Sequence, residues 1–312
     1  MVSIEAIREA AVRVRAIARV TPMIDATALA GHPLFLKCES LQPGGAFKIR
    51  GAYNMVAQLT DEQRRRGVVT FSSGNHGQAM ALAARELGAP AVVVMPTSAP
   101  RIKIEGARAF GADVIFAGTT SVERRVRAEE EAAARGLTMV PPFDHEWIIA
   151  GQGTLGLEIL EQCPGVQTVL VPVGGGGLLA GVAAAIKQTR PEVRVVGVEP
   201  SGAAAMKASL DAGHAVTLPK TETVADGLMP VRPGDLTFAH AQTFADGIVT
   251  VDDGQIIDAM LWLFTSAKVV AEPSGAATVA AALHGAAQGV TVAIVSGGNI
   301  GLDRLEELRR QR

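Results

Sequence analysis

The sequence is poor in aromatic residues, in cysteine and in excess charge of either sign. Aromatic side chains make up 4% of the chain, and 29 basic and 31 acidic residues give a formal net charge of −2. No basic stripe interleaved with aromatic residues is present, so we expect no nucleic-acid partner. The two cysteines, Cys38 and Cys163, stand far apart without a C-x-x-C spacing, which argues against a zinc or redox site.

Long apolar runs are missing as well. No stretch approaches the roughly 18 apolar residues that a membrane span requires, so no membrane partner is expected. The first 20 residues predict an amphipathic helix and lack the continuous apolar core of a signal peptide. Glu5 and Glu9 argue against an organellar transit peptide, which is poor in acidic residues. We therefore expect a cytoplasmic protein.

Short apolar runs alternate with helical periods along the 312 residues. Most runs are continuous in apolar character, which is typical of strands buried on both faces of a parallel sheet. We therefore predict an α/β protein with two lobes, each a largely parallel sheet flanked by helices, and an active site in the cleft between them. The runs expected to form strands are residues 34–37, 67–71, 91–95, 113–116, 168–173, 194–198, 247–251 and 291–295.

Two proline-containing stretches, residues 138–149 and 219–238, interrupt this alternation. We expect the first to cross between domains. Residues 51–145 would then form a small inserted domain, and residues 1–50 and 146–312 would form the large domain.

Four consecutive glycines follow the predicted strand at 168–173. Gly174, Gly175, Gly176 and Gly177 precede a predicted helix, and four backbone N–H groups without side chains at a helix N-terminus can bind a phosphate. A nicotinamide-dependent dehydrogenase is an alternative, because Gly175, Gly177 and Gly181 make a loosened dinucleotide fingerprint with Glu199 as the ribose-binding acid. Another glycine pattern, at residues 151–156, is interpreted as a helix start.

Two further loops follow predicted strands, where an open parallel sheet binds its ligands. Residues 72–76 (Ser-Ser-Gly-Asn-His) offer hydroxyls, an amide and free helix N-terminal N–H groups, which suit a carboxylate. The loop at residues 296–299 presents Ser296 beside two glycines. Lys48 lies between Phe47 and Ile49 after a Gly-Pro loop, so its amine could be desolvated and nucleophilic.

These segments together resemble the threonine dehydratase and serine racemase family of pyridoxal 5′-phosphate (PLP) enzymes, which have fold-type II, the fold of the tryptophan synthase β-subunit. The resemblance extends from about residue 19 to residue 299. Its pieces follow in the family's order: residues 45–51, 72–78, 149–156, 174–177, 225–227, 272–276 and 296–299.

The resemblance implies roles for residues in five of these segments. Lys48 would form the Schiff base with PLP, and residues 174–177 would bind the phosphate. Asn75 would contact the ring hydroxyl, Ser296 the pyridine nitrogen, and Phe47 and Glu272 would line the cofactor.

The resemblance also implies how the substrate is held. The substrate-binding residues would be Ser72, Ser73, Asn75, His76 and Arg124, with Ser73 as a second acid or base across the cofactor from Lys48. The implied reaction removes water and ammonia from a small β-hydroxy amino acid, most simply L-threonine or L-serine, with serine racemisation or hydroxyaspartate dehydration as alternatives. A homodimer or homotetramer is expected.

The sequence departs from the racemase pattern at two places. The cation site of the racemases has a carboxylate six residues after the position of Glu199, where this chain has Ala205, so no metal is expected. Pro230 replaces the racemase-like serine after the Ala-Asp-Gly segment. The chain also lacks the regulatory domain of biosynthetic threonine dehydratases, so we expect no end-product control. A non-catalytic amino-acid-binding protein on the same scaffold is a third alternative.

Overall fold

The computed structural model describes residues 1–72 and 74–312, and it contains two β-sheets. The first sheet has six strands in the order β1-β2-β10-β7-β8-β9, all parallel except β1, which pairs antiparallel with β2. Its strands are β1 (Met23–Asp25), β2 (Leu34–Lys37), β7 (Thr168–Pro172), β8 (Arg194–Pro200), β9 (Ile248–Val251) and β10 (Thr291–Ile294).

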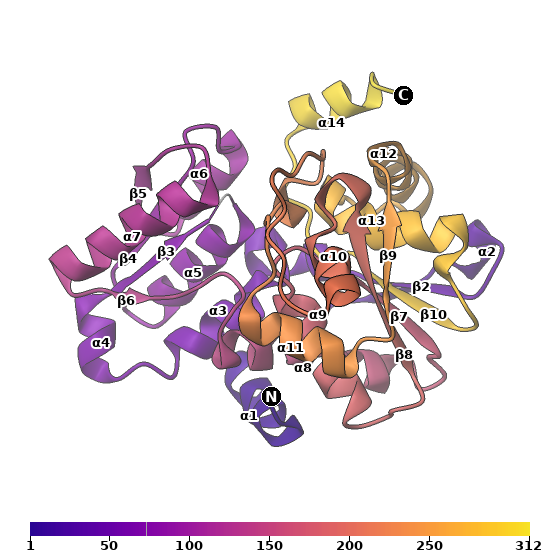
Figure 1. Ribbon diagram of the computed structural model, residues 1–312, viewed down its shortest axis with the longest axis horizontal. Helices are drawn as coiled ribbons and strands as arrows, with labels where there is room; N and C mark the ends of the chain where they lie inside the picture. The colour runs from indigo at the N-terminus through magenta and orange to yellow at the C-terminus, as the bar shows by residue number, and fades with distance from the viewer. Residues whose placement is uncertain (73) are drawn as a thin grey trace.

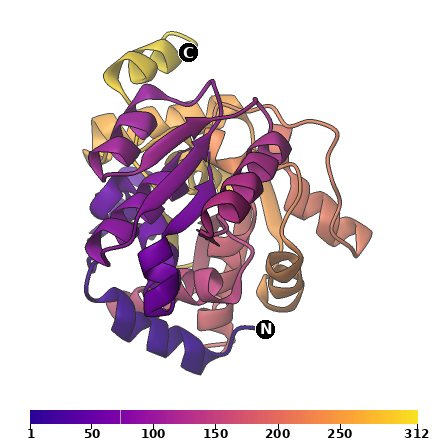
Figure 2. The same cartoon turned by 90° about the vertical axis from the view of Figure 1, so that its left-hand side faces the viewer.

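The second sheet has four parallel strands in the order β5-β4-β3-β6. In Figure 1 it lies on the left, apart from the six-stranded sheet on the right, and Figure 2 views the molecule from that side. Its strands are β3 (Val68–Phe71), β4 (Ala91–Met95), β5 (Asp113–Phe116) and β6 (Thr138–Met139).

Helices cover both faces of each sheet. On the six-stranded sheet, α12 and α13 pack on one face and α8 and α9 on the other. On the four-stranded sheet, α3 and α5 pack on one face and α7 on the other. The helices are α1 (Ile4–Val14), α2 (Thr27–Ala30), α3 (Lys48–Val56), α4 (Asp61–Arg66), α5 (Asn75–Glu86), α6 (Arg101–Ala109), α7 (Ser121–Arg135), α8 (Glu146–Gln162), α9 (Gly177–Lys187), α10 (Ala205–Ala212), α11 (Asp235–Phe244), α12 (Asp253–Trp262), α13 (Pro273–Ala281) and α14 (Leu302–Arg309), with a short 3-10 turn η4 at Asp226–Leu228.

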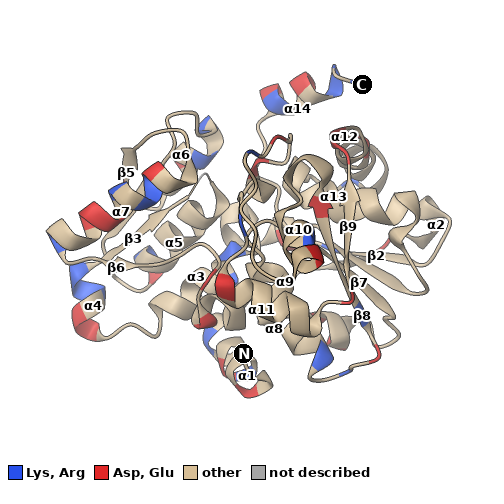
Figure 3. Cartoon of the chain, viewed as in Figure 1, with Lys and Arg blue, Asp and Glu red and all other residues tan. Residues whose placement is uncertain are grey.

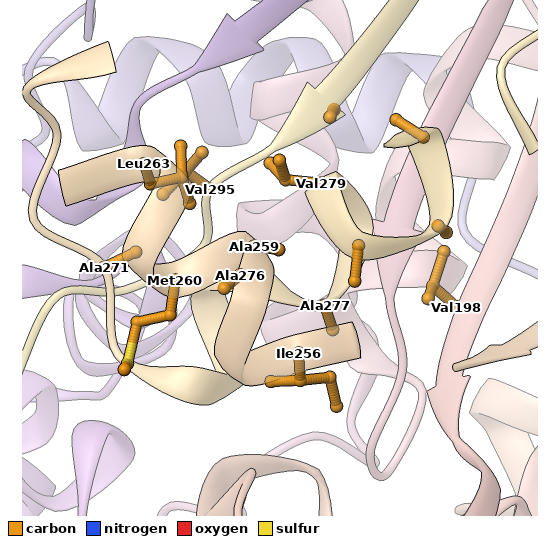
Figure 4. Packing of buried hydrophobic residues seen from close by; sticks show 14 of the residues in the cluster. Val198, Ile256, Ala259, Met260, Leu263, Ala271, Ala276, Ala277, Val279 and Val295 are labelled. Carbon is orange, nitrogen blue, oxygen red and sulfur yellow. The ribbon is translucent and has the colours of Figure 1, made fainter. Parts of the chain in front are cut away.

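The burial of the strands explains why their sequences are continuously apolar. Every residue of β4 and of β7 is buried, as expected for parallel strands covered by helices on both faces. Figure 4 shows one of these cores, in which Ile256 and Met260 of α12 and Leu263, directly after it, share one buried cluster with Ala276 and Val279 of α13. Helix α13 carries no charged residue, whereas α7 and α14 carry many (Figure 3). No helix among the described residues has the length and apolar character to cross a membrane.

The glycine pattern at residues 151–156 does not start a helix, so this prediction was wrong. Helix α8 begins at Glu146, with His145 as its N-cap, and the three glycines lie inside it. A Cβ on Gly151 would lie 2.6 Å from the Arg50 carbonyl oxygen of α3, and one on Gly153 would lie 2.9 Å from the Gly181 carbonyl oxygen of α9. These glycines therefore allow α8 to pack closely against its two neighbours.

Candidate active site

The segment that carries Lys48 is fixed to the loop after β10. The N–H of Phe47 donates to the Ser296 carbonyl over 3.1 Å, and Ala46 forms an antiparallel bridge with Gly297. The N–H of Gly298 donates to the Gly45 carbonyl over 2.9 Å. Two segments about 250 positions apart in the sequence thus form one wall of the site.

Lys48 is the first residue of α3, and its Nζ donates to the Pro142 carbonyl over 2.8 Å. The Nζ also lies 5.3 Å from the centre of the Phe47 ring. The surrounding protein removes the amine from water, which lowers the pKa of Lys48 to about 8. A substantial fraction of the amine is therefore neutral near physiological pH, the form that can act as a nucleophile or a base.

The glycine loop between β7 and α9 places its N–H groups together. Within the described chain, none of the backbone N–H groups of residues 174–177 donates to a backbone carbonyl. The Gly175 carbonyl accepts from the Thr237 hydroxyl over 2.6 Å, and Gly176 has a left-handed φ of 93°. A Cβ on Gly175 would lie 2.3 Å from the Phe143 ring. The loop is a cradle of N–H groups at positions where only glycine fits. Such a cradle can bind a phosphate.

Phe143 and Asp144 link this cradle to the lysine. They directly follow Pro142, whose carbonyl accepts from Lys48, and Phe143 packs on Gly175 and Gly177. The Asp144 carboxylate accepts hydrogen bonds from the N–H groups of residues 235–237, the first turn of α11. This segment therefore positions the lysine, the glycine loop and α11 together. The sequence gave no signal for Asp144, whose partners lie about 90 positions away.

Asn75 and Glu272 meet beside this wall. The Asn75 Nδ2 donates to Glu272 Oε1, and its Oδ1 accepts from Asn299 Nδ2 over 3.0 Å. Burial raises the pKa of Glu272, and Asp226 adds to this effect while Lys103 opposes it. Ser296 is buried, with its hydroxyl 3.5 Å from the Ser274 carbonyl.

His76 is buried and neutral. Its Nε2 lies 3.2 Å from the Val140 carbonyl, so this nitrogen carries the hydrogen, and its Nδ1 has no hydrogen-bond partner in the part of the chain that the structure describes. Burial, with the nearby Lys48 charge, lowers the pKa of His76 to about 3. Ser72 accepts at its hydroxyl from the Gly74 N–H over 3.0 Å. Ser73 lies outside the described residues.

Arg124 makes its side-chain hydrogen bond within its own loop and to none of the other predicted site residues in the described chain. It lies in the first turn of α7 and donates to the Thr119 carbonyl over 3.2 Å. Its role in substrate binding remains a prediction. The sequence reasoning missed Lys103 and gave no role to Asp226 in the 225–227 segment. Lys103 Nζ lies 2.6 Å from Asp226 and 3.0 Å from Glu272.

Two residues of the dehydrogenase alternative, Gly181 and Glu199, have structural roles here. Gly181 lies inside α9, where a Cβ would lie 2.4 Å from the Ile149 carbonyl oxygen of α8. Both carboxylate oxygens of Glu199 accept N–H groups at the start of α10, from Met206 and Lys207, each over 2.8 Å. Burial raises the pKa of Glu199 to about 7. In the described residues, no cluster of three or more His, Cys, Asp or Glu side chains has a metal-binding arrangement.

Comparison with known proteins decides the family. Residues 14–297 match the family model described as "Pyridoxal-phosphate dependent enzyme". The chain belongs to this family. PLP is accordingly its cofactor, and the orphan N–H groups of residues 174–177 and the amine of Lys48 fit its phosphate and its aldehyde.

Relatives of this PLP enzyme include ammonia-lyases and racemases. An L-threonine ammonia-lyase of Thermotoga maritima is 45% identical, over 99% of this chain and 78% of that protein. A serine racemase of Oryza sativa is 42% identical, over 97% of this chain and 93% of that protein. The structure of maize serine racemase superposes with a TM-score of 0.94 at 40% identity, covering 99% of this chain and 97% of that one. The predicted α/β fold and the fold-type II resemblance are confirmed.

Proposed function

We propose that this protein is a PLP-dependent ammonia-lyase that converts L-threonine and L-serine to α-keto acids and ammonia. The observation that carries the proposal is the amine of Lys48, which has a carbonyl as its hydrogen-bond partner and a pKa lowered to about 8. The 45% identity to an L-threonine ammonia-lyase over nearly the whole chain supports the reaction class.

PLP, when bound, supplies an electron-accepting ring that makes the α-proton of an amino acid acidic. We propose that residues 174–177 hold its phosphate through their N–H groups and that Lys48 anchors it and then takes up the α-proton. Ser296, on the loop that hydrogen-bonds Phe47, would face the pyridine nitrogen. A neutral hydroxyl there, instead of a carboxylate, disfavours full protonation of the ring and so favours loss of the β-hydroxyl over transamination.

The substrate carboxylate is assigned to the loop before α5. Ser72, Asn75 and His76 lie at the N-terminus of this 12-residue helix, where free N–H groups and the helix dipole favour an anion. Because His76 near Lys48 is neutral, it is no imidazolium that could transfer a proton to the amine. Arg124 is proposed as a further contact to the substrate.

The domain division stays a proposal. All four strands of the smaller sheet fall between Val68 and Met139, which supports a small domain at residues 51–145 and a large one made of residues 1–50 and 146–312. A cytoplasmic homodimer or homotetramer is proposed from the family resemblance, and light scattering of the purified protein would test the assembly.

The test of function is a direct assay of keto-acid release. We expect the purified holoenzyme to release 2-oxobutanoate from L-threonine and pyruvate from L-serine, because a pocket that discriminates by one methyl group gains only about 1–3 kcal/mol. Lys48→Ala should lose this activity without unfolding, as circular dichroism would check. Full turnover by Lys48→Ala, or turnover of neither amino acid by wild type, would contradict the proposal.

Serine racemisation is a second candidate, favoured by the 42% identity to a serine racemase. Lys48 lies on one side of the site and could serve only one face of a bound substrate, so racemisation would need a proton carrier on the other face. We propose Ser73 for this role and expect weak racemisation that Ser73→Ala suppresses, while threonine dehydration stays within about tenfold. An equal loss of both reactions would instead assign Ser73 to substrate binding or elimination.

A further inference from the structure

Lys103 is a buried cation between two carboxylates. It lies in α6, beside the four-stranded sheet, and its side chain is 3% exposed. Its Nζ is 2.6 Å from Asp226 Oδ2 in η4 and 3.0 Å from Glu272 Oε2, at the N-cap of α13. Both carboxylates belong to segments that flank the six-stranded sheet, so the ion cluster joins the two halves of the molecule.

The stem of Lys103 also packs against the loop proposed to hold the substrate. A Cβ on Gly74 would lie 2.2 Å from Lys103 Cδ, so the loop backbone and the lysine stem are in direct contact. Removal of the long side chain would leave a gap under this loop as well as two unpaired carboxylates.

Glu272 connects Lys103 to Asn75, because its carboxylate contacts both side chains. An ionised carboxylate can only accept hydrogen bonds, so Asn75 must present its Nδ2 to Glu272 and its Oδ1 to Asn299. Asn299 is itself held, because its Nδ2 donates to the Gly44 carbonyl over 2.8 Å. A protonated Glu272 could donate as well as accept, so only the hydrogen bond from Asn299 would still favour this orientation of the Asn75 amide.

We propose that Lys103 is a positioning residue that keeps Glu272 ionised and thereby fixes the amide of Asn75 toward the PLP ring. The inference rests on the proposed function, since the contact of Asn75 with the ring is part of it. The charged groups that act on Glu272 are Lys103 from α6 and Asp226 from η4, and Asn75 from α5 donates to it. Burial and Asp226 raise the pKa of Glu272, and Lys103 is the cation that opposes them.

The test measures PLP binding to the apoenzyme as a function of pH, by fluorescence titration between pH 6 and 9.5. We expect Lys103→Met to weaken PLP binding by about tenfold or more at neutral pH, because Glu272 becomes protonated. The ratio of the dissociation constants, variant over wild type, should fall as the pH rises and Glu272 ionises. Lys103→Arg restores a cation and should recover most of the affinity.

Two variants separate this effect from a loss of packing. Lys37 is an equally buried lysine, paired with Glu158 over 2.8 Å and part of a different cluster, so Lys37→Met should destabilise the fold without adding a pH-dependent step to PLP binding. Adding Glu272→Gln to Lys103→Met removes the titrating group. The ratio of the PLP dissociation constants should then no longer depend on pH. A pH-independent ratio in Lys103→Met, or the same step in Lys37→Met, overturns the inference. Failure of wild type to bind PLP would instead count against the proposed function.

Discussion

Arg50 is the centre of a buried ion cluster whose loss should be costly. Its guanidinium and the Glu39 carboxylate are both fully buried, with Arg50 Nε 2.7 Å from Glu39 Oε2. Arg50 Nη1 lies 2.7 Å from Glu158, and Lys37 pairs with the same glutamate. Two cations and two carboxylates therefore neutralise one another between β2, the turn that follows it, α3 and α8. We predict that Arg50→Met lowers the free energy of unfolding by about 3–5 kcal/mol, the cost of leaving a buried charge unpaired.

The destabilisation should depend on pH in a defined direction. Burial would raise the pKa of Glu39, but Arg50 and the Thr21 hydroxyl outweigh burial, and the pKa is lowered. In wild type this stabilisation is present above the unfolded value of about 4.3 and is lost as the pH falls through the folded pKa. In Arg50→Met the pKa of Glu39 rises instead. The gap between variant and wild type should therefore be largest near pH 8 and shrink toward pH 5.

Urea unfolding of the PLP-saturated proteins at both pH values would measure this gap. Adding Glu39→Gln to Arg50→Met should recover about 2 kcal/mol, since it removes the orphaned charge and leaves Lys37 paired with Glu158. Arg125→Met is the surface control: Arg125 and Glu129 are both more than half exposed, so its cost should stay below about 1 kcal/mol. A cost for Arg50→Met as small as that of Arg125→Met, or a gap that does not narrow at pH 5, would refute the reasoning.

Three further predictions concern the cofactor cradle. Gly176→Asp should prevent PLP loading, measured by absorbance of the purified protein, because its Cβ would lie 2.6 Å from Met206; Gly213→Asp, at another left-handed glycine with open space around it, should load normally. Asp144→Ala should cost about 0.5–2 kcal/mol of stability and weaken PLP binding, whereas Asp252→Ala, which removes the cap of α12, should affect stability alone. The rate of PLP uptake by apoenzyme should rise with pH through about 8, because only the neutral amine of Lys48 condenses; a rate flat from pH 6.5 to 9 in stopped-flow absorbance would contradict this.

The sequence predicted those elements whose causes are local. All eight expected runs became strands, with ends within about two residues of the expected ones. Six of these strands are largely buried on both faces, which demands apolar residues at nearly every position, whereas β5 and β9 are partly exposed edge strands. Strands β1 and β6 were not predicted, because their three and two residues are too few to show an apolar pattern. The expected helix at the N-terminus is shorter than predicted and ends at Val14. The glycines at 151–156 were wrongly interpreted as a helix start, because close helix packing requires glycine just as a turn does.

The ion clusters could not be predicted because their members are distant in sequence. Lys103 meets Asp226 and Glu272 over separations of 123 and 169 residues, and a lysine in an amphipathic helix normally indicates a solvated surface. Local pattern carries no information on such pairing, which depends on how two sheets are placed against each other.

The same pairing explains which lysine can do chemistry. Lys37 and Lys103 are buried and Lys48 is half-buried. Lys37 and Lys103 each lie within 3.0 Å of a carboxylate, and the pKa of Lys103 is raised. Over the residues that the structure describes, Lys48 pairs with no carboxylate and has the Pro142 carbonyl as its partner, so burial lowers its pKa to about 8. A carboxylate placed at Pro142 would hold the amine as an ammonium ion and remove the nucleophile. The reactivity of Lys48 therefore follows from the absence of a carboxylate partner in the described residues. An amine withdrawn from water acts as a base only where no nearby anion stabilises its charged form.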